Sequence, residues 1–435
     1  MDDPRRAIAS TDALLADPRL DDACRRLGRT AVVEVVRRAQ ALCREGRIEP
    51  GQVLDQALRL SPAYATSLRQ VVNATGVVVH TNLGRAPLSD AARSALQVAA
   101  GTTNVELDLE TGRRGQRGRA TLDALGAAVP EAEAVHVVNN GAAALALAAA
   151  VLAGGKQIVV ARGEMVEIGD GFRIPELLEA TGARLREVGT TNRASLADYA
   201  AAIGDDTGFV LKVHPSNFVV TGFTASVPAS ELASLPVPVV VDIGSGLLRR
   251  HPRLPDEPDA ASALRAGAAL VTASGDKLLG GPQCGLMLGA APLVERLRRH
   301  PLARAYRVDK LTLAALEATL TGPPTPVVRA LEADTAALRA RATALVEALS
   351  GIVEAEVVDT VAAVGGGGAP GVELPSAAVS LPETFAAPLR LGEPSVVGRV
   401  RRDRLLLDLI AVEPSDDAAL ADAVRRTAKT LDEVS

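Results

Sequence analysis

A lysine between a short apolar strand and two glycines constrains this chain more than any other feature. Lys277 follows the strand-like run from Val271 to Ser274 and a Gly-Asp turn, and it precedes Gly280 and Gly281. A strand rich in Val and Ala requires a buried sheet, so the lysine is expected at the sheet's rim, where α/β proteins build their sites. Partial burial disfavours an ammonium, and the free amine can form the Schiff base that holds pyridoxal phosphate (PLP). A solvent-exposed rim lysine fits the same pattern, so this segment alone leaves both interpretations open.

An aspartate ends a second buried-strand pattern. Asp242 follows the apolar run from Val237 to Val241, and enough chain separates it from Lys277 for a helix and one more strand. Both residues can therefore reach the same edge of the sheet. A buried carboxylate requires a partner, and the pyridine nitrogen of PLP is one that an aspartate keeps protonated. Capping of the Gly-Ser-Gly turn that follows Asp242 is the alternative role.

A third segment predicts a phosphate site. The strand-like run from Ala134 to Val138 is followed by Asn139, Asn140 and Gly141, and then by an Ala- and Leu-rich helix that begins with Ala142. The first amides of a helix are unpaired and suit a phosphate group, to which Ser274 can add a hydroxyl. An ordinary helix cap fits the turn equally well. The order of phosphate turn, strand-end Asp and strand-end Lys favours the site, because fold type I PLP enzymes use that order.

Six further segments together resemble one family, the bacterial selenocysteine synthases, or L-seryl-tRNA(Sec) selenium transferases. They occur in the family's order and are distributed over the span from about residue 68 to 320. They are Asn73 to Leu88, Arg162 to Gly169 with Phe172 to Pro175, Glu187 to Arg193, Lys212 to Phe218, Ser274 to Gln283, and His300 to Lys310.

The resemblance implies both a fold and a reaction. The fold is that of a fold type I, aspartate-aminotransferase-like PLP-dependent transferase: an α/β chain with a mainly parallel central sheet, a small N-terminal helical domain and a C-terminal small α+β domain. The reaction converts L-seryl-tRNA(Sec) to L-selenocysteinyl-tRNA(Sec) with selenophosphate, through a PLP external aldimine and an aminoacrylyl-tRNA intermediate. Lys277 would hold PLP and then accept the serine α-proton, while Asp242 would keep the ring protonated.

The pattern along the chain predicts three domains. Residues 1–65 are expected to form a helical tRNA-binding domain, residues 66–325 the large PLP-binding α/β domain, and residues 326–435 the small α+β domain. Short Val-rich strands alternate with Ala/Leu-rich helices through the second of these, which indicates a mainly parallel sheet covered on both faces. One long helix is predicted from about Val327 to Leu349, and Gly365 to Gly368 are predicted to form a loop.

Composition limits the classes of function. The chain has 435 residues, 48% of them hydrophobic, and no apolar run of transmembrane length or signal-peptide pattern is evident, so a cytoplasmic enzyme without a membrane partner is expected. Three scattered cysteines are too few for a disulfide framework or a zinc site, and Cys284 is expected to pack in the core rather than react. Aromatic residues make up only 2%, and we expect no DNA partner.

Arginines gather in the N-terminal segment although the chain's net charge is −5. They accompany an apolar helical stripe between Val32 and Leu42, and such a surface can contact phosphates. Solvated helix faces with salt bridges are the alternative, which the resemblance disfavours because this part of the family's proteins grips tRNA. The arginines are Arg25, Arg26, Arg29, Arg37, Arg38, Arg44 and Arg47.

Three other arginines are candidates for the second substrate. Arg304 and Arg307 are spaced so that one helix would place both on one face, as a fork for a phosphate-like dianion. The resemblance implies that these two and Arg85 bind selenophosphate. It also implies a homo-oligomer built from dimers whose active sites are shared between subunits.

Two other functions are considered. One is a related PLP-dependent lyase that eliminates ammonia or water from a small amino acid or amino sugar phosphate, and the other is a non-catalytic tRNA-binding protein. The Arg-rich N-terminal segment disfavours the lyase, and the presence of Lys277, Asp242 and Ser274 disfavours the non-catalytic protein. Two departures from the family pattern affect the site: Gly141 replaces a third asparagine, and Ile410 replaces an arginine that commonly follows Asp-Leu.

Overall fold

The first of two compact units in the chain is helical. The computed structural model describes residues 7–169 and 171–433. The first six residues of the predicted helical domain therefore lie outside the described part. The chain divides into two units, Met1–Gln70 and Val71–Ser435. Within its described residues the first unit contains α1 (Thr11–Leu15), α2 (Asp21–Leu27), α3 (Arg29–Arg44) and α4 (Val53–Leu60). Val32, Val36, Ala39 and Cys43 form the buried stripe of α3, at the spacing of an amphipathic helix.

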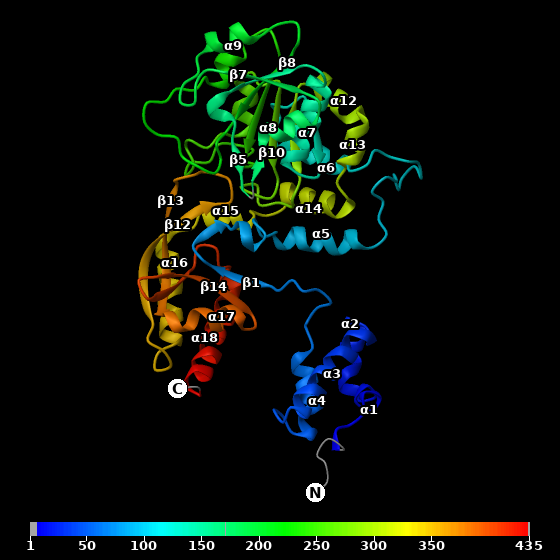
Figure 1. Cartoon of the computed structure of the whole chain (residues 1–435), viewed down its shortest axis with the longest axis vertical. Coiled ribbons are helices and arrows are strands. Elements are labelled where there is room, and N and C mark those ends of the chain that lie inside the picture. The colour runs from blue at the N-terminus through cyan, green and yellow to red at the C-terminus, as the bar shows by residue number, and fades with distance from the viewer. Residues whose placement is uncertain (1–6, 170, 434–435) are drawn as a thin grey trace. The chain divides into compact units, whose positions relative to one another are not determined.

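A mainly parallel sheet forms the centre of the second unit (Figure 1). Its strand order in the described chain is β3-β11-β10-β9-β8-β4-β7, and only β11 runs antiparallel to its neighbours. The strands are nearly continuous runs of Val, Ile, Leu and Ala, as expected for a sheet that is buried on both faces. Their bounds are β3 (Ala134–Val138), β11 (Gly285–Gly289), β10 (Leu270–Ser274), β9 (Val239–Gly244), β8 (Thr207–Val213), β4 (Gln157–Ala161) and β7 (Arg184–Val188).

Helices cover both faces of this sheet. One hydrophobic cluster packs α7 (Gly141–Ala153), α8 (Ile174–Ala180) and α12 (Ala291–Arg299) against one face. A second cluster packs the other face against α6 (Arg119–Ala128), α9 (Leu196–Ala202), α10 (Ala229–Leu232), α11 (Ala260–Arg265) and α14 (Lys310–Thr321). The remaining elements are α5 (Asp90–Ala100), α13 (Pro301–Ala305) and the small hairpin of β5 (Glu167–Ile168) and β6 (Phe172–Arg173). Because helices cover both faces, a binding site is expected at the carboxyl ends of β8, β9 and β10.

A second sheet combines the C-terminal strands with two strands from residues 71–79. Its order in the described chain is β1-β14-β15-β13-β12-β2. The bounds are β1 (Val71–Ala74), β2 (Val77–Val79), β12 (Glu356–Gly365), β13 (Glu373–Pro382), β14 (Ser395–Arg401) and β15 (Arg404–Asp408). The predicted boundary at residue 66 placed β1 and β2 in the large domain, whereas they pair with β14 and β12. Local sequence does not reveal such pairing, because the partners are some 300 residues away in the chain.

Four helices of the described residues accompany the second sheet, and they correct one prediction. These are α15 (Pro326–Leu331), α16 (Thr335–Ala348), α17 (Ala386–Leu391) and α18 (Asp417–Asp432). The single helix predicted from Val327 to Leu349 is wrong, because the chain breaks at Glu332 and the side chain of Asp334 caps a new helix by accepting a hydrogen bond from the Ala336 amide.

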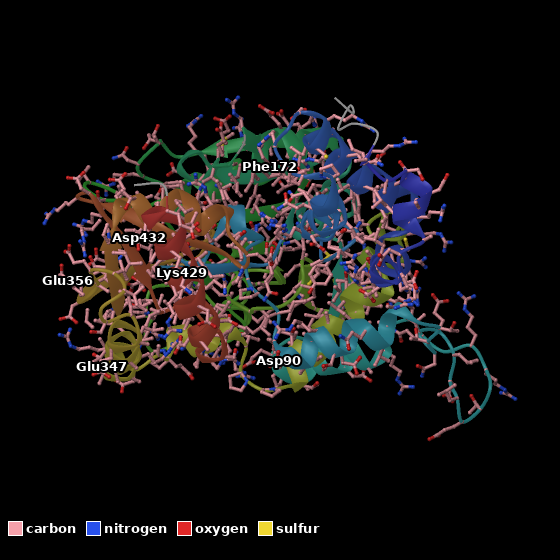
Figure 2. All side chains as sticks on the ribbon, turned by 90° about the horizontal axis from the view of Figure 1, so that it is seen from below. Asp90, Phe172, Glu347, Glu356, Lys429 and Asp432 are labelled. Carbon is pink, nitrogen blue, oxygen red and sulfur yellow. The ribbon has the colours of Figure 1, made fainter. Side chains whose placement is uncertain are left out.

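The outer faces of these helices are charged. Figure 2 shows exposed charged side chains on α16 and α18, with Glu347 and Lys429 among those labelled.

Across residues 7–169 and 171–433, no helix combines the length and the apolar character that crossing a membrane requires.

Gly76 allows β1 and β2 to pack closely against the C-terminal strands. Gly76, between β1 and β2, has φ +77°, and a Cβ there would lie 2.7 Å from Asp408 Oδ2 and 2.8 Å from Arg399 Nη1. Asp408 is fully buried and accepts hydrogen bonds from Ser376 and Arg399. A side chain at residue 76 would therefore strain the backbone and disrupt a buried ion pair at the same time.

We predict that Gly76→Ala lowers the free energy of unfolding by about 2–4 kcal/mol, from the left-handed backbone and the overpacked contact. Urea unfolding followed by circular dichroism measures the change. Gly204→Ala is the matched control, because no atom lies within 4 Å of its Cβ position. Equal stabilities for the two variants would contradict the assigned role of Gly76.

Candidate active site

Lys277 lies in a buried cradle of glycines just beyond the carboxyl end of β10. The residue is 8% exposed. A Cβ at Gly367 would lie 3.0 Å from Lys277 Nζ, and one at Gly244 would lie 4.0 Å from it. Both glycines have positive φ, so the backbone can approach the amine where no other residue would allow it. No hydrogen bond or ion pair engages Nζ among the described residues.

Burial lowers the pKa of Lys277, because an ammonium loses its hydration in this cradle. The negative charge of Asp242 opposes that change, while the nearby guanidinium of Arg85 adds to it. The net result favours a neutral amine, which is the form that attacks an aldehyde. The exposed rim lysine considered from the sequence is therefore excluded.

Asp242 lies on β9 beside the lysine and is 6% exposed. Burial raises the pKa of its carboxyl group, while a 2.7 Å hydrogen bond from Thr272 Oγ1 to Oδ1 and an interaction with the Gly244 amide act in the opposite direction. A cationic ring nitrogen placed against this carboxyl group would reverse the effect of burial. The carboxyl group of Asp242 thus interacts with the turn that follows it, and this interaction leaves a role in binding a cofactor open.

The predicted phosphate turn adjoins the end of β10. Asn140 caps α7, its Oδ1 accepting a hydrogen bond from the Ala143 amide at 2.8 Å. A Cβ at Gly141 would lie 2.8 Å from Ser274 Oγ, so the hydroxyl stands directly against the start of the helix. The amides of Gly141 and Ala142 have no acceptor among the described residues. A hydroxyl and two amides at a helix N-terminus form an anion-receptive group.

Asn139 is placed differently from the other residues of the turn. Its side chain is exposed, and its backbone amide donates a hydrogen bond to Tyr306 O at 2.9 Å. The residue therefore ties the turn to the segment that follows α13.

The three predicted substrate-binding arginines line two separate cavities. Arg85 lines a cavity of about 460 Å³ and pairs with Asp276 at 2.6 Å, next to Lys277. Arg304 and Arg307 line another of about 620 Å³. Their expected place on one helix is wrong, because α13 ends at Ala305. Its five residues are too short to carry both, yet the chain still brings both guanidinium groups to one cavity.

Several residues of the site were not singled out from the sequence. The loop from Gly365 to Gly368 belongs to the C-terminal sheet, and it covers the amine of Lys277. His214 follows β8, and its Nε2 lies 3.1 Å from Glu257 Oε2. The His214 amide donates to the Asp242 carbonyl oxygen at 2.9 Å. The position of His214 after a strand was a usable signal, whereas the glycine loop and Glu257 reach the site only through tertiary packing.

The residues fit the aldehyde, phosphate and ring nitrogen of PLP. They supply a buried amine with a lowered pKa, a hydroxyl and free amides at a helix N-terminus, and a buried carboxyl group on the neighbouring strand. Cys284 does not contribute a nucleophile, because burial raises the pKa of its thiol to about 12. A cavity of about 860 Å³ beside α5 and α14 is lined by none of the predicted site residues.

Comparisons with known proteins identify the same family over nearly the whole chain. The family model described as L-seryl-tRNA selenium transferase matches residues 71–413, and the one described as selenocysteine synthase N terminal matches residues 5–44. The L-seryl-tRNA(Sec) selenium transferase of Geobacter sulfurreducens is 43% identical, over 92% of this chain and 94% of the relative. The protein of the same name from Moorella thermoacetica is 42% identical, over 96% of each chain.

A solved structure shares the fold. The structure of D-glucosaminate-6-phosphate ammonia-lyase superposes with a TM-score of 0.58 at 20% identity, covering 83% of this chain and 96% of that one. The predicted fold class, a fold type I α/β architecture with a mainly parallel central sheet, is thereby confirmed.

We predict that Gly141→Ala weakens PLP binding by about 10- to 100-fold, the equivalent of one hydrogen bond to a charged group. The added methyl group would displace Ser274 Oγ and cover the start of α7. Equilibrium titration of cofactor-free protein with PLP measures the dissociation constant. Gly126→Ala, in α6 with no atom within 4 Å of the new Cβ, serves as the control. An unchanged affinity in Gly141→Ala would argue against the phosphate turn.

A second prediction concerns stability and pH in cofactor-free protein. Because burial lowers the pKa of Lys277 below 10.5, the unfolded chain binds a proton that the folded chain lacks between the two values. Stability therefore rises with pH across that window, by up to about 1.4 kcal/mol per pH unit. Lys277→Met should be more stable than the wild type at pH 7, with a difference that shrinks toward pH 10.

Urea unfolding at pH 7 and at pH 9 measures this difference. Lys429→Met, at an exposed lysine of α18, should show no comparable change with pH. A Lys277→Met difference that is independent of pH would mean that the buried amine is not the cause.

Proposed function

The chain belongs to the L-seryl-tRNA selenium transferase family, and from this premise we propose that it converts L-seryl-tRNA(Sec) to L-selenocysteinyl-tRNA(Sec). The observation that carries the proposal is the buried amine of Lys277, which lies at the end of β10 in a chain that matches family members along nearly its whole length. The lyase alternative has no comparable support. Likeness to an ammonia-lyase at 20% identity concerns the fold alone.

We propose PLP as the cofactor of this site. Lys277 would bind its aldehyde, while Ser274, Asn140, Gly141 and Ala142 would surround its phosphate, with Asn139 supporting the turn through its backbone. Asp242 would pair with the ring nitrogen. When bound, PLP supplies an electron sink that stabilises negative charge at the α-carbon of the amino acid.

The chain's own groups would move the proton. With PLP supplying the electron sink, the free amine of Lys277 would be the base for the α-proton of serine. Burial lowers the pKa of that amine, which favours the neutral form that a base requires. Asp242 would hold its charge only against a cation, because burial otherwise raises its pKa.

We propose that the first unit binds the tRNA. We propose residues 1–65 as the tRNA-binding domain, residues 66–325 as the PLP-binding domain, and residues 326–435 as the small domain, with β1 and β2 joining the last. Arg37, Arg38 and Arg44 on α3 are exposed and form no ion pair with the described residues, whereas Arg26 pairs with Asp22. Unpaired guanidinium groups along one helix suit a row of phosphates.

Selenophosphate is proposed as the selenium donor. Arg304 and Arg307 form a basic cavity with Arg298. Arg85 lies instead beside Lys277, paired with Asp276. One small dianion cannot engage both places within one chain, so we propose a homo-oligomer of dimers whose neighbouring subunits complete each other's sites. We place the reaction in the cytoplasm, where charged tRNA is used.

Conversion of seryl-tRNA(Sec) in the presence of selenophosphate tests the proposal. We predict product formation by the wild type, and a loss of at least about 10³-fold in Lys277→Ala, which lacks both the cofactor attachment and the base. Chromatography of the amino acid released from the tRNA identifies selenocysteine. A wild-type protein that binds PLP but leaves the seryl group unchanged would overturn the proposed reaction.

The same assay isolates the role of the first unit. The double variant Arg37→Ala/Arg38→Ala should raise KM for the tRNA about 10-fold or more at 0.15 M salt with kcat little changed, because it removes only phosphate contacts. Arg26→Ala is the matched control, since that arginine is already paired.

A further inference from the structure

Glu257 is buried beside the candidate active site but takes no part in the proposed binding of PLP or in the proton transfer to Lys277. The side chain of Glu257 is 1% exposed and precedes α11. Its Oε2 lies 3.1 Å from His214 Nε2 and accepts a 2.7 Å hydrogen bond from the Ala369 amide, while its Oε1 has no partner among the described residues. A carboxylate with an unsatisfied oxygen is costly to bury, so a structural role alone explains it poorly.

The imidazole of His214 is fixed by this carboxylate. Because Nε2 faces Glu257, Nδ1 is the ring nitrogen that remains available, and no hydrogen bond engages it within the described chain. The side chain is 20% exposed and lines a cavity of about 550 Å³. A histidine that is oriented through one nitrogen by a carboxylate can exchange a proton through the other.

Two independent contacts connect this pair to the residues of the candidate active site. The His214 amide donates to the Asp242 carbonyl oxygen at 2.9 Å, so His214, one residue beyond β8, lies beside the strand β9 that carries Asp242. Glu257 also holds Ala369, which has φ +48° and ends the glycine loop that covers Lys277 Nζ. The charged groups near His214 include Glu257 from the segment before α11 and Asp242 from β9, while Lys212 on its own strand is paired with Glu164. Arg193, Asp256 and Asp259 line the same cavity.

The proposed reaction needs an acid in this position. Removal of the α-proton is assigned to Lys277, but the β-oxygen of serine leaves readily only if it takes up a proton as its bond to the β-carbon breaks. Resting on the proposed function, we propose that His214, as an imidazolium whose Nε2–H is donated to Glu257, donates this proton from Nδ1 and becomes a neutral imidazole. The electron pair of the Cα–H bond becomes the second Cα–Cβ bond, the Cβ–O pair stays on oxygen, and oxygen departs with the proton as water. His214 then recovers a proton from solvent.

A leaving group that needs no proton provides the test. The variant His214→Gln keeps an amide that can donate a hydrogen bond to Glu257 but cannot deliver a proton. With seryl-tRNA(Sec) we expect product formation to fall by about 10²-fold or more, the usual contribution of a general acid. With β-chloroalanyl-tRNA(Sec), whose chloride leaves unprotonated, the variant should stay within about threefold of the wild type.

Exchange of the serine α-proton in deuterium oxide reports on the other half of the reaction. It should stay within about threefold of the wild-type rate in His214→Gln, because binding and Lys277 are untouched. His251→Gln is the matched control, since His251 also lies near a glutamate, Glu332 at 3.9 Å, but outside the site. It should leave both substrates unaffected.

The outcomes separate this inference from the proposed function. Equal losses with the seryl and chloroalanyl substrates would overturn the role of His214, and so would loss of α-proton exchange. If His214→Gln fails to bind PLP, the same ratio is measured in Glu257→Gln, for which we expect about a tenfold selective loss with the seryl substrate. A wild-type protein that makes no selenocysteinyl-tRNA would instead overturn the proposed function.

Discussion

Burial of one amine is the constraint on which the rest of this structure depends. Burial disfavours an ammonium at Lys277, and the carboxyl group of Asp242, which opposes this effect most strongly among the nearby charges, has its own charge disfavoured by burial. The two groups therefore fit each other poorly as a simple ion pair. Lys277 would bind an aldehyde and Asp242 would pair with a ring cation, and these two partners would relieve both costs.

The C-terminal half completes the cradle. The loop from Gly365 to Gly368 reaches Lys277 because β12, from which it continues, pairs with β2 at the start of the second unit. Cβ atoms at Gly365 and Gly366 would lie 2.3 Å from side-chain atoms of Val77 and Val79, so the loop needs its glycines to pack on β2. The sheet that β1 and β2 join is thus a structural support of the site, and not only a separate small domain.

The sequence predicts the parts of this site that obey local rules. Strand β4 covers the whole apolar run from Ile158 to Ala161, and the turn at Asn140 and Gly141 is an ordinary helix cap next to a strand-end serine. Glu257 and Ala369 obey no local rule. They meet because α11 and the C-terminal sheet pack against the same strand ends, and a contact across 112 residues leaves no periodic pattern in one sequence. The break before Asp334 was missed for a different reason: the apolar spacing continues across a cap.

The replacement of an arginine by Ile410 has a physical account in this fold. Ile410 is 5% exposed and belongs to the hydrophobic core of the C-terminal half, and its amide donates a hydrogen bond to the buried Asp408. Asp408 already has a cationic partner in Arg399. An arginine at position 410 would put a charged side chain into this apolar core, whereas isoleucine fills the space without a buried charge. Ile410 is therefore a packing residue that supports the sheet carrying the glycine loop, and its effect on the reaction would act through the position of that loop.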